Sequence, residues 1–478
     1  MVVARYADGH LTLVDRLREM VRLADGLTSD LLLSDDAQQL ALDCLSRFGE
    51  RLRSFDPNDV VAVGTNTLRR AKNGAEFLQR AKAHLGHSID IISGLEEARL
   101  VYLGASHSVP PSSKRRLVVD IGGGSTELIV GQGFEPQRMY SLFMGCVSIS
   151  RVFFPGGRIS RRKLEEARLT IDQEIAPVVA PLKALGWKYA FGSSGTARAI
   201  QEVLTEVDPQ ATAITADGMR RLRNQLLQLK HMDEVSWNNL QERRRPVFLG
   251  GLLIMERIFD ALNIESMTPT DYSLREGLLY DTLGKWSGED ARERSVRVLA
   301  NKYDADPDQA QRLATIALKL FKRVYKEWHL PRRQSRQLLR WAATLHEIGL
   351  GIAHSHYHRH GGYIVANADL PGFSRNLQQR LAWLIAGHRR RVPPLPSMAA
   401  QSSWNERLPK LLAVLRIAVV IVRGRQVDDV PKIRAQVDGD CLRVRFPRGW
   451  LQKRPLTELG LKEEAEIFAA LGIRMKFA

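Results

Sequence analysis

The stretch from Leu117 to Val130 constrains the fold of this chain more than any other. It runs LVVDIGGGSTELIV, an apolar strand, a glycine turn and a second apolar strand. Strands that are apolar at successive positions are typical of a sheet buried on both faces. Consecutive glycines let backbone N–H groups approach phosphoryl oxygens without obstruction by side chains, and the two hydroxyls that follow add donors. We therefore expect an α/β fold with a hairpin around an anion. The predicted substrate-binding residues of this turn are Gly122, Gly123, Gly124, Ser125 and Thr126.

Two carboxylates flank the turn. Asp120 ends the first strand and Glu127 begins the second. Hard divalent cations favour carboxylate oxygens, water and substrate phosphates, so acids beside a phosphate loop predict direct or water-mediated ligands of Mg²⁺ or another divalent cation. A glycine hairpin with two exposed acids is the structural alternative.

A second candidate anion loop follows the apolar strand from Tyr189 to Phe191. Its sequence, Gly192-Ser193-Ser194-Gly195-Thr196, precedes a helical pattern. Strand, glycine loop and helix N-terminus together form a natural anion site, which predicts Ser194, Gly195 and Thr196 as substrate-binding residues. A Ser/Thr turn that only caps its helix is the alternative.

The periodicity of the chain predicts its organisation. Short β-branched runs at residues 60–64 and 89–93 enclose a helical pattern, and a basic stretch at 106–116 separates them from the glycine turn, which suggests two α/β lobes. After Gly131 we expect long helices with strands at 189–191 and 266–268. Beyond Lys285 helical periodicity dominates, and Cys441 to Phe446 alternates like a strand, so an all-helical domain and a small β-containing unit should follow.

The charge of the chain indicates the kind of partner that it binds. Lys and Arg number 70 against 53 acidic residues, a formal charge of +17, which favours a polyanionic partner. Apolar runs are shorter than the roughly 20 residues of a membrane-spanning helix, and no leader opens the chain, so a cytoplasmic protein is expected. Cys44, Cys146 and Cys441 stand alone without the spacing of a zinc site or disulfide framework.

Several motifs together resemble the exopolyphosphatase and guanosine pentaphosphate phosphohydrolase family. They are DIGGGSTEL from Asp120, SGLEEARL from Ser93, MGCV from Met144, GSSGT from Gly192 and LREG from Leu274. The resemblance covers nearly the whole chain. It implies an actin-like ATPase fold of two ribonuclease-H-like lobes (1–102 and 103–285), a helical HD-like domain (286–425) and a small C-terminal α+β unit (426–478).

The resemblance also implies roles at the cleavage site. It assigns the activation of water to Glu97, with the adjacent Glu96 pointing elsewhere, and phosphate contact to Arg69. Arg69 follows the strand at 60–63, and open α/β sheets bind ligands at the carboxyl ends of strands. From the residues alone, Glu96 and Glu97 are equally explained as acids that start a helix.

Two departures from the family pattern stand out. Family members begin with a strand and an Asp-Leu-Gly-Ser-Asn-Ser-like phosphate loop before the segment that matches Met1 to Arg5, and here that loop is missing. A start codon assigned too late and a truly truncated protein are both open, with the first favoured. In the helical region, the His-Asp pair of HD-type phosphohydrolases is His346-Glu347, so structural or polyanion-contacting histidines are favoured over a metal site.

The expected substrate is inorganic polyphosphate, cleaved from its end by an exopolyphosphatase. Segments such as Phe154-Pro155-Gly156-Gly157 and His358-Arg359-His360 resemble the exopolyphosphatase branch, and a basic chain suits a polymer. Guanosine pentaphosphate hydrolysis and a catalytically impaired polyanion-binding protein are the alternatives, and an actin-like kinase is a third. A homodimer is expected, and peripheral association with the inner membrane face is left open.

Overall fold

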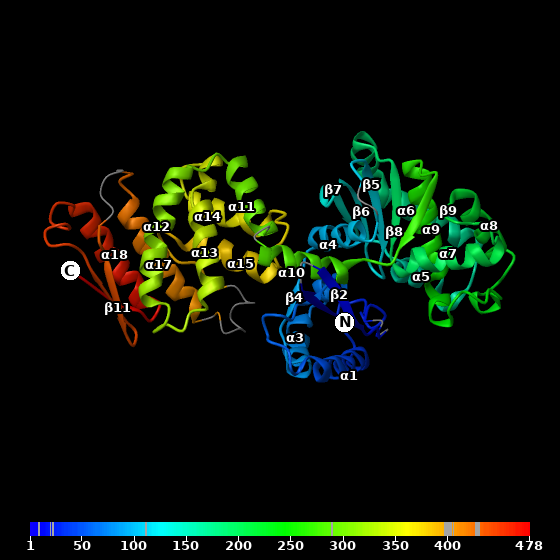
Figure 1. The fold of residues 1–478 in the computed structure, drawn as a ribbon, viewed down its shortest axis with the longest axis horizontal. Coiled ribbons are helices and arrows are strands. Elements are labelled where there is room, and N and C mark those ends of the chain that lie inside the picture. The colour runs from blue at the N-terminus through cyan, green and yellow to red at the C-terminus, as the bar shows by residue number, and fades with distance from the viewer. Residues whose placement is uncertain are drawn as a thin grey trace. The chain divides into compact units, whose positions relative to one another are not determined.

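The chain forms two compact units, Met1–Asp290 and Ala291–Ala478 (Figure 1). The computed structural model describes all residues except 8–9, 20, 22, 110–111, 288–289, 396–403, 405 and 426–430. Each unit is described by itself below.

A six-stranded mixed sheet forms the centre of the first unit, in the order β7-β6-β5-β8-β10-β9. The hairpin β5–β6 is antiparallel, whereas β8 runs parallel to β5 and β10 parallel to β8. The strands are β5 (Arg115–Ile121), β6 (Thr126–Gln132), β7 (Glu135–Leu142), β8 (Tyr189–Ser193), β9 (Ile214–Thr215) and β10 (Ser266–Thr270). The helices that accompany them are α5 (Cys146–Phe153), α6 (Arg161–Leu185), α7 (Gly195–Val207), α8 (Ala216–Leu226), α9 (Arg245–Leu262) and α10 (Leu274–Ser287), with 3₁₀ turns at Pro155–Gly157, Met232–Glu234 and Glu242–Arg244.

The hairpin β5–β6 is apolar because both of its faces are covered. Val119 and Ile121 belong to the large core with α6, α7 and α9, whereas Val118 and Ile129 pack in a second cluster with α4 (Gly94–His107). Side chains alternate along a strand, so Asp120 and Glu127 project to the same face as Val118 and Ile129. The two carboxylates therefore share the face that α4 covers.

The N-terminal part of this unit contains two separate two-stranded sheets, β1–β2 and β3–β4. An apolar cavity of about 580 Å³ is lined by residues of β1, β3, α1 and α10. The elements of this part, besides α4, are β1 (Val2–Ala7), β2 (His10–Arg16), α1 (Asp35–Leu52), β3 (Ala62–Gly64), α2 (Asn66–Arg70), α3 (Gly74–Leu85) and β4 (Ile89–Ile91).

Helices α4 and α10 cross at very short range. A Cβ on Gly277 would lie 1.9 Å from the carbonyl oxygen of Leu100, and one on Gly104 would lie 2.2 Å from that of Ser273. Only glycine permits this approach of two backbones. The crossing fixes the position of α4, whose first turn carries Glu97.

The second unit is a helical bundle with a three-stranded sheet, in the order β11-β12-β13. Residues of the helices and of the sheet share one hydrophobic core, which includes Leu338, Leu412, Val444 and Phe468. The elements are α11 (Ala291–Lys302), α12 (Pro307–Val324), α13 (Arg332–Leu345), the 3₁₀ turn Ile348–Gly351, α14 (Tyr357–Asn367), α15 (Arg375–Gly387), α17 (Arg407–Val422), β11 (Arg434–Asp438), β12 (Cys441–Arg445), α18 (Pro455–Ala470) and β13 (Arg474–Phe477).

The predicted fold class is confirmed: two α/β parts precede a helical domain with a small α+β region. The expectation of only helices between Gly131 and the strand at 189–191 was wrong, because β7 pairs with β6 and extends the sheet. All positions of β7 except the last are exposed or half-buried, as at a sheet edge, so the segment lacks the apolar run of a central strand. The finer domain boundaries stay predictions. Among the described helices, none is long and apolar enough to cross a membrane.

Candidate active site

The glycine turn between β5 and β6, which we call the glycine loop (residues 122–126), is held from behind by α5. Gly122 N–H donates to the Ser125 carbonyl at 2.9 Å, and the carbonyls of Gly122 and Gly123 accept from Cys146 and Val147 at 2.9 and 3.0 Å. Gly145 must be glycine here, since a Cβ would lie 2.4 Å from the Gly123 carbonyl. The N–H groups of Gly123 and Gly124 donate no backbone hydrogen bond in the described part of the chain, which leaves them for an anion.

The two acids beside the loop are buried and face each other across the hairpin. Asp120 pairs with Glu127 in the β5–β6 register, and Asp120 accepts hydrogen bonds from Ser193 Oγ at 3.1 Å and Ser273 Oγ at 2.7 Å. Glu127 accepts one from Ser141 Oγ at 2.8 Å. Burial raises the pKa of Asp120 to about 7. Burial, and then the charges of Glu97 and Asp120, raise the pKa of Glu127 well above its ordinary value.

Glu97 joins these acids from the first turn of α4. Its carboxylate accepts from Arg69 Nη1 at 3.0 Å, and the same nitrogen donates to the Ile92 carbonyl at 2.9 Å. Burial raises the pKa of Glu97, and the charge and hydrogen bond of Arg69 oppose this rise. The charge of Glu97 acts on both Asp120 and Glu127. The structure thus brings three carboxylates, one guanidinium and the glycine loop together.

Glu96 points elsewhere, as the sequence predicted. It forms two hydrogen bonds of 2.8 Å with Arg99, and Arg99 Nη2 also donates to Asp281 at 2.6 Å. All three side chains are buried. This network connects α4 to α10. Glu96 therefore stabilises the packing of these two helices, whereas its neighbour Glu97 faces Arg69.

The second predicted loop is built mainly as a helix cap. Ser194 Oγ accepts hydrogen bonds from the N–H groups of Thr196 and Ala197 at the start of α7, and Thr196 Oγ1 donates to the Ile121 carbonyl at 3.0 Å. Gly195 lies directly against the guanidinium of Arg244, whose Nη2 would be 1.6 Å from an added Cβ. Ser194 therefore caps α7, as the alternative interpretation predicted. Thr196 also connects this loop to β5, the strand that carries Asp120.

One correction concerns Thr126. Its hydroxyl was expected to add a donor to the anion site, but it is fully buried and donates to the Met144 carbonyl at 2.7 Å. Because an inward-facing position of β6 directs this side chain into the core, Thr126 holds the loop.

Sequence reasoning missed Asn66. This residue begins α2, is 6% exposed, and its Nδ2 is buried with no hydrogen-bond partner in the described part of the chain. A Cβ on Gly124 would lie 3.1 Å from that nitrogen. A buried donor without a partner is costly, so its position at the glycine loop points to a ligand oxygen. The only sequence signal was its place after a strand.

The donor set suits a hard cation. Asp120 and Glu127 offer carboxylate oxygens beside the loop, which matches the way Mg²⁺ is held by one or two carboxylates together with water and substrate phosphates. No group of three or more His, Cys, Asp or Glu side chains in the described residues is arranged as a complete metal cage. The residues fit a cation that the substrate helps to bind.

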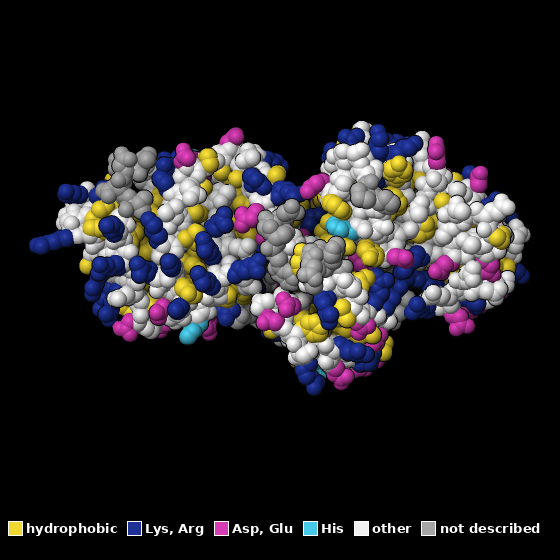
Figure 2. All heavy atoms as spheres, viewed as in Figure 1, with side chains coloured by type: hydrophobic (Ala, Val, Ile, Leu, Met, Phe, Trp, Pro, Cys, Tyr) yellow, Lys and Arg dark blue, Asp and Glu magenta, His cyan; other side chains and the backbone are white. Residues whose placement is uncertain are grey.

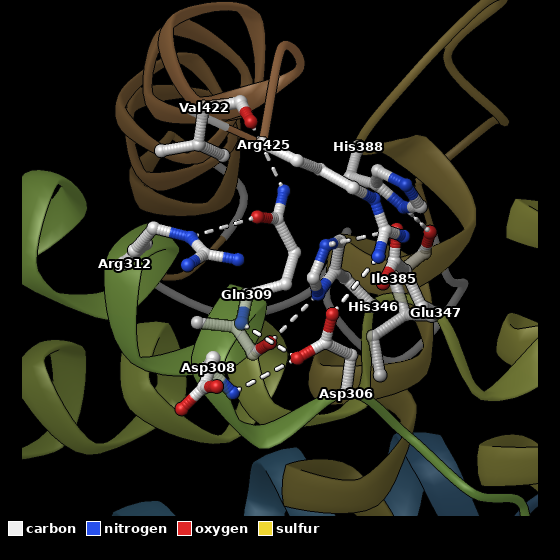
Figure 3. A network of polar contacts seen from close by, with 11 residues as sticks. Asp306, Asp308, Gln309, Arg312, His346, Glu347, Ile385, His388, Val422 and Arg425 are labelled. Atoms are coloured by element: carbon white, nitrogen blue, oxygen red, sulfur yellow. Dashed lines mark hydrogen bonds and ion pairs between the residues drawn. The ribbon is translucent and has the colours of Figure 1, made fainter. Parts of the chain in front are cut away.

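The histidine motif of the second unit lies at the end of a helix. His346 follows the last residue of α13, and its Nδ1 contacts the Ala343 carbonyl at 2.7 Å, while Glu347 accepts from Arg425 at 2.7 Å (Figure 3). Arg425 also donates to Asp306, the N-cap of α12, at 2.9 Å. His388 is buried nearby, with Nδ1 2.6 Å from the Ile385 carbonyl. These contacts connect the ends of neighbouring helices through His346, Glu347 and Arg425. They agree with the expectation that the histidines have a structural role.

A two-lobed α/β fold with a glycine phosphate loop and three convergent carboxylates defines a phosphohydrolase of the actin-like class. The chain belongs to the Ppx/GppA phosphatase family. The family model matches residues 2–286, and the model of Ppx/GppA phosphatase domain III matches residues 291–465.

Curated relatives match nearly the whole chain. A guanosine-5'-triphosphate,3'-diphosphate pyrophosphatase of Vibrio vulnificus is 38% identical over 465 residues, 97% of this chain and 93% of that protein. One of Aliivibrio fischeri with the same name is 35% identical over 466 residues, 98% of this chain and 93% of that protein.

Solved structures agree in fold. An exopolyphosphatase from Cytophaga hutchinsonii superposes with a TM-score of 0.54 at 23% identity, over 59% of this chain and 94% of that one. The Ppx/GppA family member of Aquifex aeolicus gives 0.50 at 24% identity, over 59% and 93%.

Proposed function

We propose that this protein hydrolyses the terminal phosphoanhydride of guanosine pentaphosphate and releases orthophosphate. The observation that carries the proposal is the convergence of Glu97 with the glycine loop and two further buried acids. The names of the relatives at 35–38% identity favour the nucleotide over the polyphosphate substrate that the sequence motifs suggested.

The chemistry follows from the positions of the groups. The free N–H groups of Gly123 and Gly124 and the amide of Asn66 bind oxygens of the terminal phosphoryl group, and Arg69 offsets its charge. Glu97 orients a water molecule and accepts its proton as the oxygen attacks phosphorus. The bond from that phosphorus to the bridging oxygen breaks, so the terminal group leaves as orthophosphate and the nucleotide keeps the bridging oxygen on its new terminal phosphate. A magnesium ion held by Asp120 and Glu127 would neutralise charge on the phosphates. The raised pKa of Glu97 makes its carboxylate a stronger proton acceptor than an ordinary glutamate.

Inorganic polyphosphate is the second candidate substrate. The formal charge of +17 favours a polymer with many negative charges, because an extended basic surface releases counterions along such a chain. Both substrates present the same terminal phosphoanhydride, so the same residues serve either.

Phosphate release from each substrate tests the proposal. The full chain should release orthophosphate from guanosine pentaphosphate, and Glu97→Gln should reduce kcat at least 100-fold while substrate binding is largely kept. Glu76→Gln, a change at an exposed acid on α3, is the matched control and should keep wild-type turnover.

Three other outcomes would change the proposed substrate, activity or catalytic residue. Release from polyphosphate alone would select the second candidate. Binding of polyanions without any release would favour a catalytically silent protein. Full turnover by the Gln variant would remove Glu97 from the mechanism.

A further inference from the structure

Arg116 of β5 is buried without a counter-charge. It is 2% exposed, and its Nε has no hydrogen-bond partner among the described residues. The guanidinium forms one long hydrogen bond to them, from Nη1 to the Ser106 carbonyl at 3.5 Å, and no ion pair. Figure 2 shows Lys and Arg side chains at the surface, where water solvates them. Arg116 lacks that solvation, and a buried charge that nothing balances is costly.

Arg116 lies at the opposite end of the hairpin from the reacting groups. Side chains alternate along β5, so Arg116 and Asp120 share the face that α4 covers. Four residues of an extended strand span about 13 Å. Glu97 is in the first turn of α4, whereas Ser106 is in its last turn. Arg116 therefore has no part in the chemistry at the glycine loop.

A cavity of about 280 Å³ adjoins the guanidinium. The Ser106 hydroxyl is buried there and has no hydrogen-bond partner in the described part of the chain. Ser112 Oγ accepts from the Lys114 N–H at 3.1 Å, and Gln132 donates to the Ser113 carbonyl at 2.8 Å, so this turn is held beside β6. The cavity is lined by Ser106, Ser112, Ser113, Arg116, Gly133 and Phe134, none of which is acidic.

The neighbouring Tyr102 does not balance the charge of Arg116. Its hydroxyl donates to the Gly133 carbonyl at 3.3 Å. Burial raises the pKa of Tyr102 to about 12, so the phenol is neutral at neutral pH. The Ser106 hydroxyl and the charge of Arg116 oppose this rise, although no hydrogen bond joins Ser106 to Tyr102. Glu135, whose charge also acts on Tyr102, is an exposed residue of the edge strand β7.

We propose that this cavity binds an orthophosphate ion through the Arg116 guanidinium and the hydroxyls of Ser106 and Ser113. These donors match the oxygens of such an ion, and its charge balances the buried guanidinium. The cavity is smaller than the roughly 300–1,000 Å³ of pockets for drug-sized ligands, which favours an inorganic ion over a nucleotide. The site is distinct from the glycine loop and binds its ion without turnover.

Titration calorimetry of orthophosphate into the full chain counts the ions. The wild type should bind one ion at the glycine loop and one at Arg116. Arg116→Met should lose the second, and Asn66→Asp, at the glycine loop, should lose the first. Arg115→Met is the matched control, because it removes the same charge from the exposed neighbour on β5 and should leave both ions bound. Arg116→Lys keeps the charge without the planar fork and should bind more weakly than the wild type.

Thermal unfolding separates ion binding from a structural role of Arg116. Without phosphate, Arg116→Met should be at least as stable as the wild type, because an unbalanced buried charge is replaced by an apolar side chain of similar length. Saturating orthophosphate should raise the wild-type midpoint by about 2–5 °C more than that of Arg116→Met, with sodium chloride at equal ionic strength as the reference.

Three results would overturn the site. The first is an Arg116→Met protein that is destabilised without phosphate yet keeps the full phosphate effect, since Arg116 would then only cap α4. The second is phosphate binding that no Arg116 variant alters. The third is an Arg116-dependent effect of guanosine monophosphate without one of orthophosphate. A chain that hydrolyses neither substrate can still bind this ion, so failure of the proposed function is recognised separately.

Discussion

The role of each carboxylate at this site depends on the groups that it contacts. Glu97 and Glu96 are neighbours in sequence, yet Glu97 faces Arg69 beside the glycine loop, and Glu96 is bound to Arg99 in a buried network. The Glu97 carboxylate lies beside the glycine loop and accepts from Arg69 there, whereas both oxygens of Glu96 accept from Arg99 away from the loop. In the proposed function Glu97 is the catalytic carboxylate, whereas Glu96 helps to connect α4 to α10 through Arg99.

Arg69 should influence both substrate affinity and the pH profile. Arg69→Ala should raise KM about tenfold or more, because a charge-assisted contact to phosphate is lost. Arg69 lowers the pKa of Glu97, so its removal should move the acidic limb of the kcat profile to higher pH. A pH series of kcat and KM measures both effects. Arg70→Ala on the same short helix is the control, and a pH profile that does not move would separate Arg69 from Glu97.

Asn66 should bind substrate through its amide nitrogen, which has no hydrogen-bond partner among the described residues. Asn66→Ala should raise KM severalfold to about thirtyfold, since one hydrogen bond to a charged oxygen is lost. Asn66→Asp should be worse, because a carboxylate would meet the phosphate. The thermal midpoint of Asn66→Ala should change little without substrate, because Nδ2 donates no hydrogen bond to the described residues that the substitution could break. Loss of stability with an unchanged KM would mean a purely structural residue.

Helices and strands position the site through close crossings. The pleat of β5 and β6 directs Asp120 and Glu127 to the face of α4, and the α4–α10 crossing brings the first turn of α4 to that place. The short contacts at Gly104 and Gly277 leave no room for side chains, which explains the glycine of the LREG motif in packing terms.

Gly277→Ala should therefore damage the protein although it touches no reacting atom. The added Cβ would lie 1.9 Å from a backbone oxygen, so α4 must shift, and we expect a loss of about 1–3 kcal/mol in the free energy of unfolding together with a lower kcat. Denaturant unfolding and kcat measure the two effects. Gly133→Ala would not serve as a control because Gly133 has φ +58°; Gly424→Ala, where an added Cβ meets nothing within 4 Å, is the suitable one. Wild-type stability in Gly277→Ala would contradict the crossing.

The two units of the molecule have different contents. The first contains every residue of the candidate site, and the second combines helices and a small sheet around one core. Within that core three histidines, His346, His358 and His388, are at most 3% exposed. Their burial lowers the pKa of each, to about 4 for His358.

The second unit should lose stability in mild acid. A histidine whose folded pKa is depressed binds its proton first in the unfolded state, so stability is complete above about pH 6.5 and falls as the pH drops towards the folded pKa. Between about pH 6.5 and pH 4.5 His358, whose folded pKa is about 4, should cost roughly 1–3 kcal/mol, and His346 and His388 should add to this loss. Hydrogen exchange of peptides from α13 to α15 in the full chain measures this opening.

Variants of these histidines make the acid prediction specific. His388→Gln should flatten the pH dependence of exchange, and His354→Gln, at an exposed histidine of the same unit, should not. If the protection of α13 to α15, after correction for the intrinsic pH dependence of amide exchange, stays constant down to pH 4.5, the histidines do not have different pKa values in the folded and unfolded states.

The sequence by itself determined the glycine loop, its two flanking acids and the α/β-then-helical order, because strand patterning, glycine runs and helical periodicity are local properties of the chain. Only the tertiary structure decided which acid faces the loop, that Thr126 and Thr196 use their hydroxyls within the fold, and that Asn66 has a buried donor without a partner among the described residues. Such convergence depends on helix crossings and sheet order, which bring together residues as far apart in sequence as Arg16 and Glu276, 260 positions, and no local pattern encodes which of them will touch.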